Sequence, residues 1–195
     1  MKVIGLTGAI AVGKSEVAKI FRKNNIPVFD SDAAVHEIYQ NGVGAKYLQS
    51  TFPSAINAGS VDRRKLSEII AAHPSKLKDI EKIIHPLVRQ AEADFLSNAQ
   101  RNNETIVIID SPLLIETNHH EDMDATILVN APSDVQTKRA MLRPNMTQEK
   151  LAVIRSKQMA FKDKRKFSSY IIENNGSLKD LETQTTAVIA KIREI

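Results

Sequence analysis

The most specific chemical signal in the sequence is the segment GAIAVGKS at residues 8–15, called here the phosphate loop. It matches the pattern G-x-x-x-x-G-K-[ST] and lies between an expected strand and an expected helix, as that pattern requires. Glycine at both ends permits close approach of the backbone, whose N–H groups can face phosphate oxygens at a helix N-terminus. Lys14 is expected to bridge the β- and γ-phosphates, and the Ser15 hydroxyl to reach Mg²⁺. A nucleoside triphosphate is the predicted ligand, and an unliganded tight turn is the alternative. The loop residues predicted to bind the nucleotide are Gly8, Ala11, Val12, Gly13, Lys14, Ser15 and Glu16.

Two carboxylates follow the second expected strand. Asp30 and Asp32 stand directly after the apolar residues 26–29. Ligands of doubly wound sheets lie beyond the carboxyl ends of the strands, so this position places Asp30 beside the phosphate loop. Asp30 is the predicted general base for a hydroxyl acceptor, and Asp32 is a predicted ligand to substrate or Mg²⁺. The alternative is that one of the pair caps the next helix, a role that Asp32 could fill.

A third carboxylate ends a later apolar run. Asp110 follows residues 105–109, the usual position for a carboxylate that holds Mg²⁺ through water. Asp110 is therefore predicted to contribute to both the metal and the substrate sites, with capping of the next turn as the alternative. For Glu116, six residues later, a site role and a surface role are equally expected.

These side chains need a layered α/β scaffold to position them. Short apolar runs predict strands, and runs that are buried on both faces and alternate with helices favour a parallel sheet. A helix is expected from Ser15, and a last helix over Leu178–Ile192. The expected strands are Lys2–Thr7, Ile26–Phe29, Thr105–Ile109, Ala125–Val129 and Tyr170–Ile172.

The chain is expected to be one kinase-sized unit with two insertions. The core comprises 1–30, 104–140 and 168–195. Residues 31–103 are read as a helical insertion beside the sheet with no convincing strand, in which Pro86 opens a further helix. Residues 141–167, which are polar and basic, are read as a mobile lid. Within the lid, the run 162–166 is expected to be a solvated face, or alternatively a patch that focuses the field on anions.

Composition excludes several functional classes. The 195 residues include no cysteine, which excludes thiolate metal sites and a cysteine nucleophile. No apolar run approaches a membrane span, so a cytoplasmic protein without membrane contact is expected. The net charge of +4 suits a polyanionic ligand, but 5% aromatic residues and no tryptophan disfavour stacked nucleic acid. A monomer is favoured.

Taken together, these segments resemble the dephospho-CoA kinase family over nearly the whole chain. The resemblance depends on the order and spacing of the phosphate loop, D-S-D at 30–32, H-P at 85–86, D-S-P-L-L-I-E at 110–116 and I-I-E-N-N-G at 171–176. Arg89, the pair Arg139 and Arg143, and the pair Arg155 and Gln158 contribute as well. It implies a P-loop NTPase three-layer α/β core with a parallel sheet, a helical region that holds the coenzyme A moiety, and a lid.

The resemblance also implies a reaction and further roles. The γ-phosphoryl group of ATP would pass, with Mg²⁺ present, to the ribose 3′-hydroxyl of 3′-dephospho-CoA, the last step of coenzyme A biosynthesis. Arg139, a catalytic candidate beside Asp30 and Lys14, and Arg143 would approach ATP from the lid side. Their spacing of four residues predicts one helical face, and ordinary surface arginines are the alternative. Asn174 or Asn175 would lie near the adenine. The acceptor would meet Asp32, His85, Arg89, Asp110 and Leu113.

Some positions depart from the family pattern, and two other functions stay open. Ala9 and Ala11 stand where the family usually has glycine, and Glu16 where threonine is common. A kinase resembling shikimate kinases would also place D-x-D after the second strand, but would carry a glycine triplet that this chain lacks. A nucleotide-binding module without catalysis is the second alternative. Acceptor turnover distinguishes the three.

Overall fold

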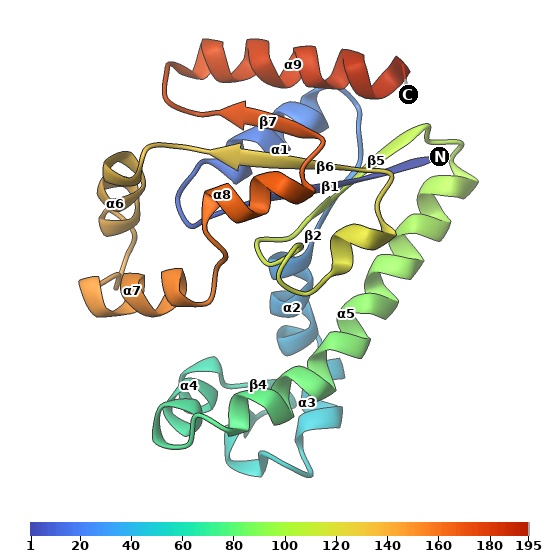
Figure 1. The fold of residues 1–195 in the computed structure, drawn as a ribbon. Helices are drawn as coiled ribbons and strands as arrows, with labels where there is room; N and C mark the ends of the chain where they lie inside the picture. The colour runs from blue at the N-terminus through green and yellow to red at the C-terminus, as the bar shows by residue number, and fades with distance from the viewer. Residues whose placement is uncertain (195) are drawn as a thin grey trace. The chain divides into compact units, whose positions relative to one another are not determined.

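The structure is a computed structural model that describes residues 1–194 (Figure 1). The chain divides into two compact units. The first comprises Met1–Phe29 and the chain from Ala99 onward, and the second comprises Asp30–Asn98. Residues 141–167 belong to the first unit.

A five-stranded sheet forms the centre of the first unit, in the order β2-β5-β1-β6-β7. Strand β1 pairs in parallel with β5 and β6, and β6 pairs in parallel with β7. The register aligns Leu6 with Asp110 and Gly8 with Val129, so the chain leaves neighbouring strands at a common edge. The predicted strands are all present, with ends that differ by one or two residues. The strands are β1 Lys2–Gly8, β2 Val28–Asp30, β5 Ile106–Asp110, β6 Ala125–Asn130 and β7 Tyr170–Glu173.

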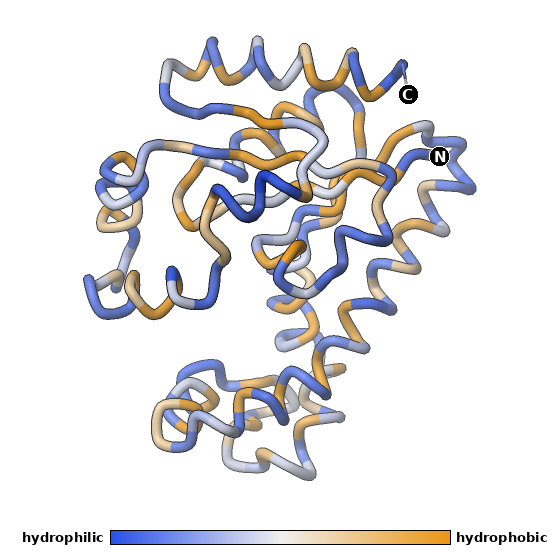
Figure 2. The backbone as a smooth tube through the Cα atoms, viewed as in Figure 1, coloured by the Kyte–Doolittle hydropathy of each residue, from blue (hydrophilic) through white to orange (hydrophobic). Residues whose placement is uncertain are grey.

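Two helices share a hydrophobic core with one face of this sheet. They are α1 (Lys14–Lys23) and α9 (Leu178–Glu194), the latter extending beyond its predicted end. Alternate residues of the strands, such as Ile4 and Leu6 of β1, are fully buried in this core with Phe21. Figure 2 shows the apolar residues along the strands and the striped pattern of α9. The remaining elements of the unit are η2 (His119–Asp122), α6 (Ser133–Met141), α7 (Gln148–Ser156), α8 (Phe161–Lys164) and η3 (Arg165–Phe167).

The second unit has its own apolar core, built around buried residues such as Leu48, Phe52 and Ile84. Its elements are α2 (Ser31–Gln40), α3 (Val43–Leu48), η1 (Pro53–Ala55), β3 (Ile56–Asn57), β4 (Ser60–Val61), α4 (Arg63–Ala72) and α5 (Lys76–Arg101), which ends in the first unit. The prediction that this region has no strand is wrong, because β3 and β4 pair as a short antiparallel hairpin. The hairpin turn places Ala58 and Gly59 at positive φ, as tight two-residue turns require.

Pro86 does not open a new helix, contrary to the prediction. Helix α5 continues through it for 26 residues. A proline inside a helix removes one backbone hydrogen bond and crowds a carbonyl, which normally breaks the helix. Here Pro86 lies on the exposed side, while Ile80 and Ile84 bury the opposite side in the core. Tertiary packing therefore outweighs the local cost.

Within residues 1–194, none of the helices combines the length and the apolar character that a membrane crossing requires.

Candidate active site

The phosphate loop joins β1 to α1 in a conformation that depends on its two glycines. A Cβ atom at Gly8 would lie 2.7 Å from the backbone oxygen of Val129, so a side chain cannot be accommodated there. Gly13 has a φ of 93° and stands at the start of α1, where its carbonyl accepts from the N–H groups of Glu16 and Val17. The predicted strand–loop–helix context is therefore present, and the N-terminus of α1 opens toward the loop.

Two side chains from distant segments hold the loop backbone. The Nδ2 atom of Asn174 donates to the carbonyl of Val12 at 2.8 Å, and Asn174 is buried. The Oε1 atom of Gln158 accepts from the N–H of Ile10 at 2.9 Å. The neighbouring Asn175 is exposed. Asn174 is thus committed to the loop in this structure, and Gln158 is a loop contact for which sequence reasoning assigned no role.

Ala11 takes a glycine-like conformation, with a φ of 62°. An L-residue in the left-handed region costs about 1–2 kcal/mol. Ala11 is buried with Ile10, Ala140 of α6 and Leu151 of α7 in a small apolar cluster. Packing of the loop against α6 and α7 therefore helps to hold the strained residue where the family pattern has glycine.

Lys14 and Asp110 form an ion pair where β1 and β5 lead into the site. The Lys14 side chain is 16% exposed and the Asp110 side chain 3% exposed, so the lysine is the member that solvent or a ligand can reach. Ser15 is exposed at the first turn of α1. Glu16, predicted to bind the nucleotide, pairs with Lys19 at 2.8 Å on the surface of the same helix.

Arg139 lies beside the loop, and Arg143 does not share its helical face. The Nη1 atom of Arg139 is buried, has no hydrogen-bond partner within residues 1–194, and lies 3.8 Å from where a Cβ at Gly13 would be. A buried guanidinium nitrogen without an acceptor is costly, and an anion at the loop would satisfy it. The expectation of one shared face is wrong because α6 ends at Met141 and Arg143 follows it, exposed.

In the second unit, Asp30 is the residue that caps α2. Its Oδ1 atom accepts from the N–H of Ala33 at 3.0 Å, so the cap predicted as available to Asp32 is made by Asp30. A carboxylate has a second oxygen, so capping does not consume its capacity to accept. Asp32 is exposed in the first turn of the same helix. His85 and Arg89 are both exposed on α5, one helical turn apart.

The turn after β5 holds Glu116 largely buried, so its predicted surface role is wrong. Its Oε1 atom accepts from the N–H of Met159 at 2.8 Å and pairs with Lys164 at 3.0 Å. Glu116 is thus held in the interior, while its Oε2 atom is buried without a hydrogen-bond partner within residues 1–194, so a site role stays a prediction. Leu113, in the same turn, is half-buried, and its carbonyl accepts from Thr117.

Lys164 corrects the expectation for the run 162–166. The expected solvated face is wrong at this residue, whose side chain is 1% exposed. Lys162 and Lys166 are exposed, as a solvated face predicts. Lys164, the last residue of α8, is therefore buried, while Lys162 before it and Lys166 after it face solvent.

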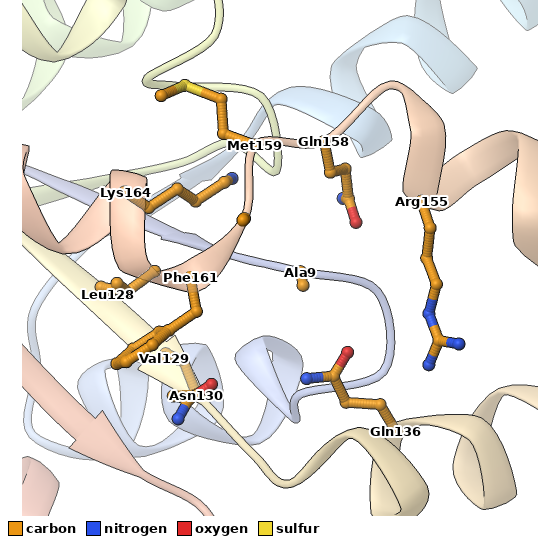
Figure 3. A pocket seen from close by; sticks show the side chains of 11 residues that line it. Ala9, Leu128, Val129, Asn130, Gln136, Arg155, Gln158, Met159, Phe161 and Lys164 are labelled. Carbon is orange, nitrogen blue, oxygen red and sulfur yellow. The ribbon is translucent and has the colours of Figure 1, made fainter.

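A cavity of about 270 Å³ adjoins the loop on the side of Gln158 (Figure 3). The end of β6, the start of α6 and residues 155–164 enclose it. Figure 3 shows the polar side chains of Gln136, Arg155 and Gln158 on one wall and the Phe161 ring on another, with the Ala9 methyl between them. The Arg155 guanidinium donates to Thr137 at 2.8 Å, so it is anchored to α6.

This arrangement can bind a polyphosphate. Backbone N–H groups at a helix start, the Lys14 ammonium and the orphaned guanidinium nitrogen of Arg139 converge on one loop. Such a set neutralises phosphate charge and orients a transferable phosphoryl group.

The comparisons with known proteins agree with this reading. A family model described as dephospho-CoA kinase matches residues 2–180. The dephospho-CoA kinase of Bartonella henselae is 41% identical over 192 residues, which cover 98% of each chain. That of Mesorhizobium japonicum is 42% identical over 194 residues, covering 99% of this chain and 98% of the relative. The crystal structure of TT1252 from Thermus thermophilus superimposes with a TM-score of 0.83 at 35% identity, over 97% of both chains. The chain belongs to the dephospho-CoA kinase family.

Proposed function

We propose that this chain transfers the γ-phosphoryl group of ATP to the ribose 3′-hydroxyl of 3′-dephospho-CoA, giving ADP and coenzyme A. One observation carries the proposal: a phosphate loop that contains Lys14 and lies beside the unpartnered guanidinium nitrogen of Arg139, in a chain that matches this family over residues 2–180. The loop supports the phosphoryl chemistry, and the family match supports the acceptor.

In the proposed reaction the 3′-hydroxyl oxygen forms a bond to the γ-phosphorus, and the bond to the bridging β–γ oxygen breaks. The electron pair of that bond leaves with ADP. Asp30 orients the hydroxyl and receives its proton. Lys14, Arg139 and the loop amides stabilise the charge on the phosphate oxygens. We assign adenine contact to Asn175, with Asn174 supporting the loop, and acceptor contact to Asp32, His85, Arg89 and Leu113.

The donors that would hold Mg²⁺ are the Ser15 hydroxyl and the Asp110 carboxylate. Both are hard oxygen donors, and Mg²⁺ usually takes only one or two protein ligands beside phosphates and water. Within residues 1–194, no cluster of three metal-ligating side chains occurs, and a site of this type does not need one. When bound, Mg²⁺ would supply charge neutralisation at the β- and γ-phosphates.

Acceptor turnover tests the proposal. The protein is mixed with ATP, Mg²⁺ and dephospho-CoA, and ADP and coenzyme A are followed together, with shikimate, gluconate and nucleosides as parallel acceptors. Stoichiometric coenzyme A, with little ADP when the acceptor is omitted, is expected. ADP formed only with another alcohol would move the assignment to a different small-molecule kinase. ATP binding without turnover of any acceptor would favour a non-catalytic module.

Asp30→Asn isolates the base within the same assay. Asparagine caps helices as well as aspartate does, so the cap on Ala33 is preserved while the proton acceptor is lost. Coenzyme A formation should fall by about 10²–10⁴-fold with ATP binding nearly unchanged. An unchanged kcat would show that Asp30 is not the base. Asp30→Ala, which removes both functions, is the matched control for the loss of the cap.

A further inference from the structure

The buried Lys164 is not explained by nucleotide binding or by the lid. Lysine is almost never fully buried unless it is paired, because removing an ammonium from water is costly. Here the side chain is 1% exposed. Burial lowers the pKa of Lys164, and the hydrogen bond with Glu116 opposes that shift. Lys164, whose burial carries this free-energy cost, belongs to the same unit as the phosphate loop.

The ammonium of Lys164 connects the ends of two strands. It donates to the carbonyl of Pro112 at 2.9 Å and reaches the Thr7 hydroxyl at 3.5 Å, in addition to its pair with Glu116. Thr7 is the residue before Gly8, where the phosphate loop begins, and Pro112 follows Asp110 by two residues. The Thr7 hydroxyl also donates to the Pro112 carbonyl at 3.3 Å, so Lys164 is the third member of a contact that joins the start of the loop to the turn after Asp110.

Lys164 is also one end of a strap, defined as residues 158–164. At the other end, Gln158 holds the N–H of Ile10 inside the loop. Next to it, the N–H of Met159 donates to the same Glu116 oxygen that pairs with Lys164. Figure 3 shows the strap along the cavity, with Lys164 and Gln158 at its two ends. The strap is thus fixed both to the loop and to the turn after β5.

Stability alone does not account for an ion pair at this place. Replacing a buried pair with apolar residues of similar volume is often neutral or stabilising. What an apolar side chain cannot supply is three directed donors that fix Thr7, Pro112 and Glu116 relative to one another. Phosphoryl transfer depends on such positioning, and a displacement of about 1 Å can cost about 10²-fold in rate.

We propose that Lys164 is a positioning residue for phosphoryl transfer, which sets the phosphate loop and the turn after Asp110 in register through Thr7 and Pro112. It does not touch the reacting atoms. The inference rests on the proposed function, since transfer to dephospho-CoA is its readout.

The experiment compares three variants with the unmodified protein. Lys164→Met leaves the Glu116 charge without its partner, while Glu116→Gln/Lys164→Met removes both charges and keeps an acceptor for Met159. Lys166→Met removes an exposed lysine from the same segment and is the matched control. For each, the melting temperature, kcat, and the KM for ATP and for dephospho-CoA are measured.

The double variant is the decisive member, because it is expected to fold even if Lys164→Met does not. Its melting temperature should lie within a few degrees of that of the unmodified protein, while its kcat falls about 10- to 100-fold with both KM values within threefold. Lys166→Met should match the unmodified protein in every quantity.

Two outcomes overturn the proposal in different ways. If the unmodified protein turns over dephospho-CoA and the stable double variant keeps its kcat, Lys164 is only a structural residue. If the unmodified protein forms no coenzyme A, the proposed function fails, and the positioning role fails with it. A loss confined to the KM for ATP would also contradict the proposal, since it would indicate weaker nucleotide binding rather than misplacement in the transition state.

Discussion

Two ammonium–carboxylate pairs in the first unit differ in what surrounds them. Lys14 pairs with Asp110 at the end of β5, and Lys164 at the end of α8 pairs with Glu116 in the turn after β5. Lys14 remains 16% exposed and stands in the phosphate loop, whereas Lys164 is 1% exposed and donates to interior backbone and hydroxyl oxygens. Lys14 can therefore be reached by a ligand and Lys164 cannot. We call Lys14–Asp110 the open pair and Lys164–Glu116 the closed pair.

The difference teaches that exposure, not charge, separates a ligand-binding lysine from a positioning lysine. A lysine that water can reach can exchange a carboxylate for a phosphate without being left unpaired in a dry interior. A sealed lysine cannot exchange its partners without a large penalty. Loss of one member of the Lys164–Glu116 pair should therefore appear first in stability, and loss of Lys14 first in catalysis.

The largest expected effect on stability comes from Glu116→Gln. This variant leaves the Lys164 ammonium buried without its carboxylate, a change that typically costs about 3–5 kcal/mol. For a chain of this size the melting temperature should fall by roughly 10 °C. Glu121→Gln, at an exposed glutamate nearby, is the control and should leave it unchanged.

The pH dependence of this loss has a definite sign. Burial already lowers the pKa of Lys164, and removing Glu116 removes an interaction that raises it. Between this lowered pKa and the ordinary lysine pKa of 10.5, the folded variant binds fewer protons than the unfolded chain, so its stability rises with pH in that window. The deficit against the unmodified protein should be smaller at pH 9 than at pH 7. A stability difference between Glu116→Gln and the unmodified protein that grows with pH would contradict the burial of the Lys164 ammonium in this pair.

At the open pair, Lys14→Met should remove catalysis more than stability. Loss of one charged stabiliser of a transition state typically lowers kcat by about 10²–10³-fold. The melting temperature should fall as well, because the variant leaves the Asp110 carboxylate, which is 3% exposed, without its partner. Lys19→Met, one turn further along α1 and exposed, is the control for loss of a lysine. A kcat within threefold of the unmodified value would remove Lys14 from the proposed mechanism.

The contrast between the pairs also marks what the sequence could predict. The phosphate loop was predictable because its glycines and lysine carry local geometric demands that the spacing expresses. The parallel sheet was predictable because its strands are largely apolar on both faces, as in β5, where four apolar residues precede Asp110 and all five are buried. Lys164 was not, since it lies in a run of charged residues whose composition indicates solvent exposure, and only tertiary contacts distinguish it from Lys162 and Lys166. The hairpin β3–β4 and the passage of α5 through Pro86 were missed for the same reason.

A smaller effect should come from the link between the strap and the loop. Gln158→Ala removes the acceptor of the Ile10 N–H, and an unsatisfied partly buried donor costs about 1–3 kcal/mol. Since this donor lies in the loop, the loss should appear as roughly tenfold weaker ATP binding. Gln136→Ala is the matched control, because Gln136 lines the same cavity but donates to Ala131 outside the loop. Equal effects in the two variants, measured by titration calorimetry, would mean that the strap does not support the loop.

The smallest effect concerns the two alanines that replace glycine in the loop. Ala11 has a φ of 62°, whereas Ala9 does not have a positive φ. Glycine at either position increases the entropy of the unfolded chain and removes one methyl group, so these costs largely cancel when Ala11→Gly is compared with Ala9→Gly. What remains is relief of the left-handed conformation at residue 11, about 1–2 kcal/mol. Ala11→Gly should therefore melt roughly 3 °C above Ala9→Gly. The opposite order would show that burial of the Ala11 methyl in the cluster with Leu151 stabilises the fold by more than the backbone strain costs. Packing against α7 would then stabilise the loop.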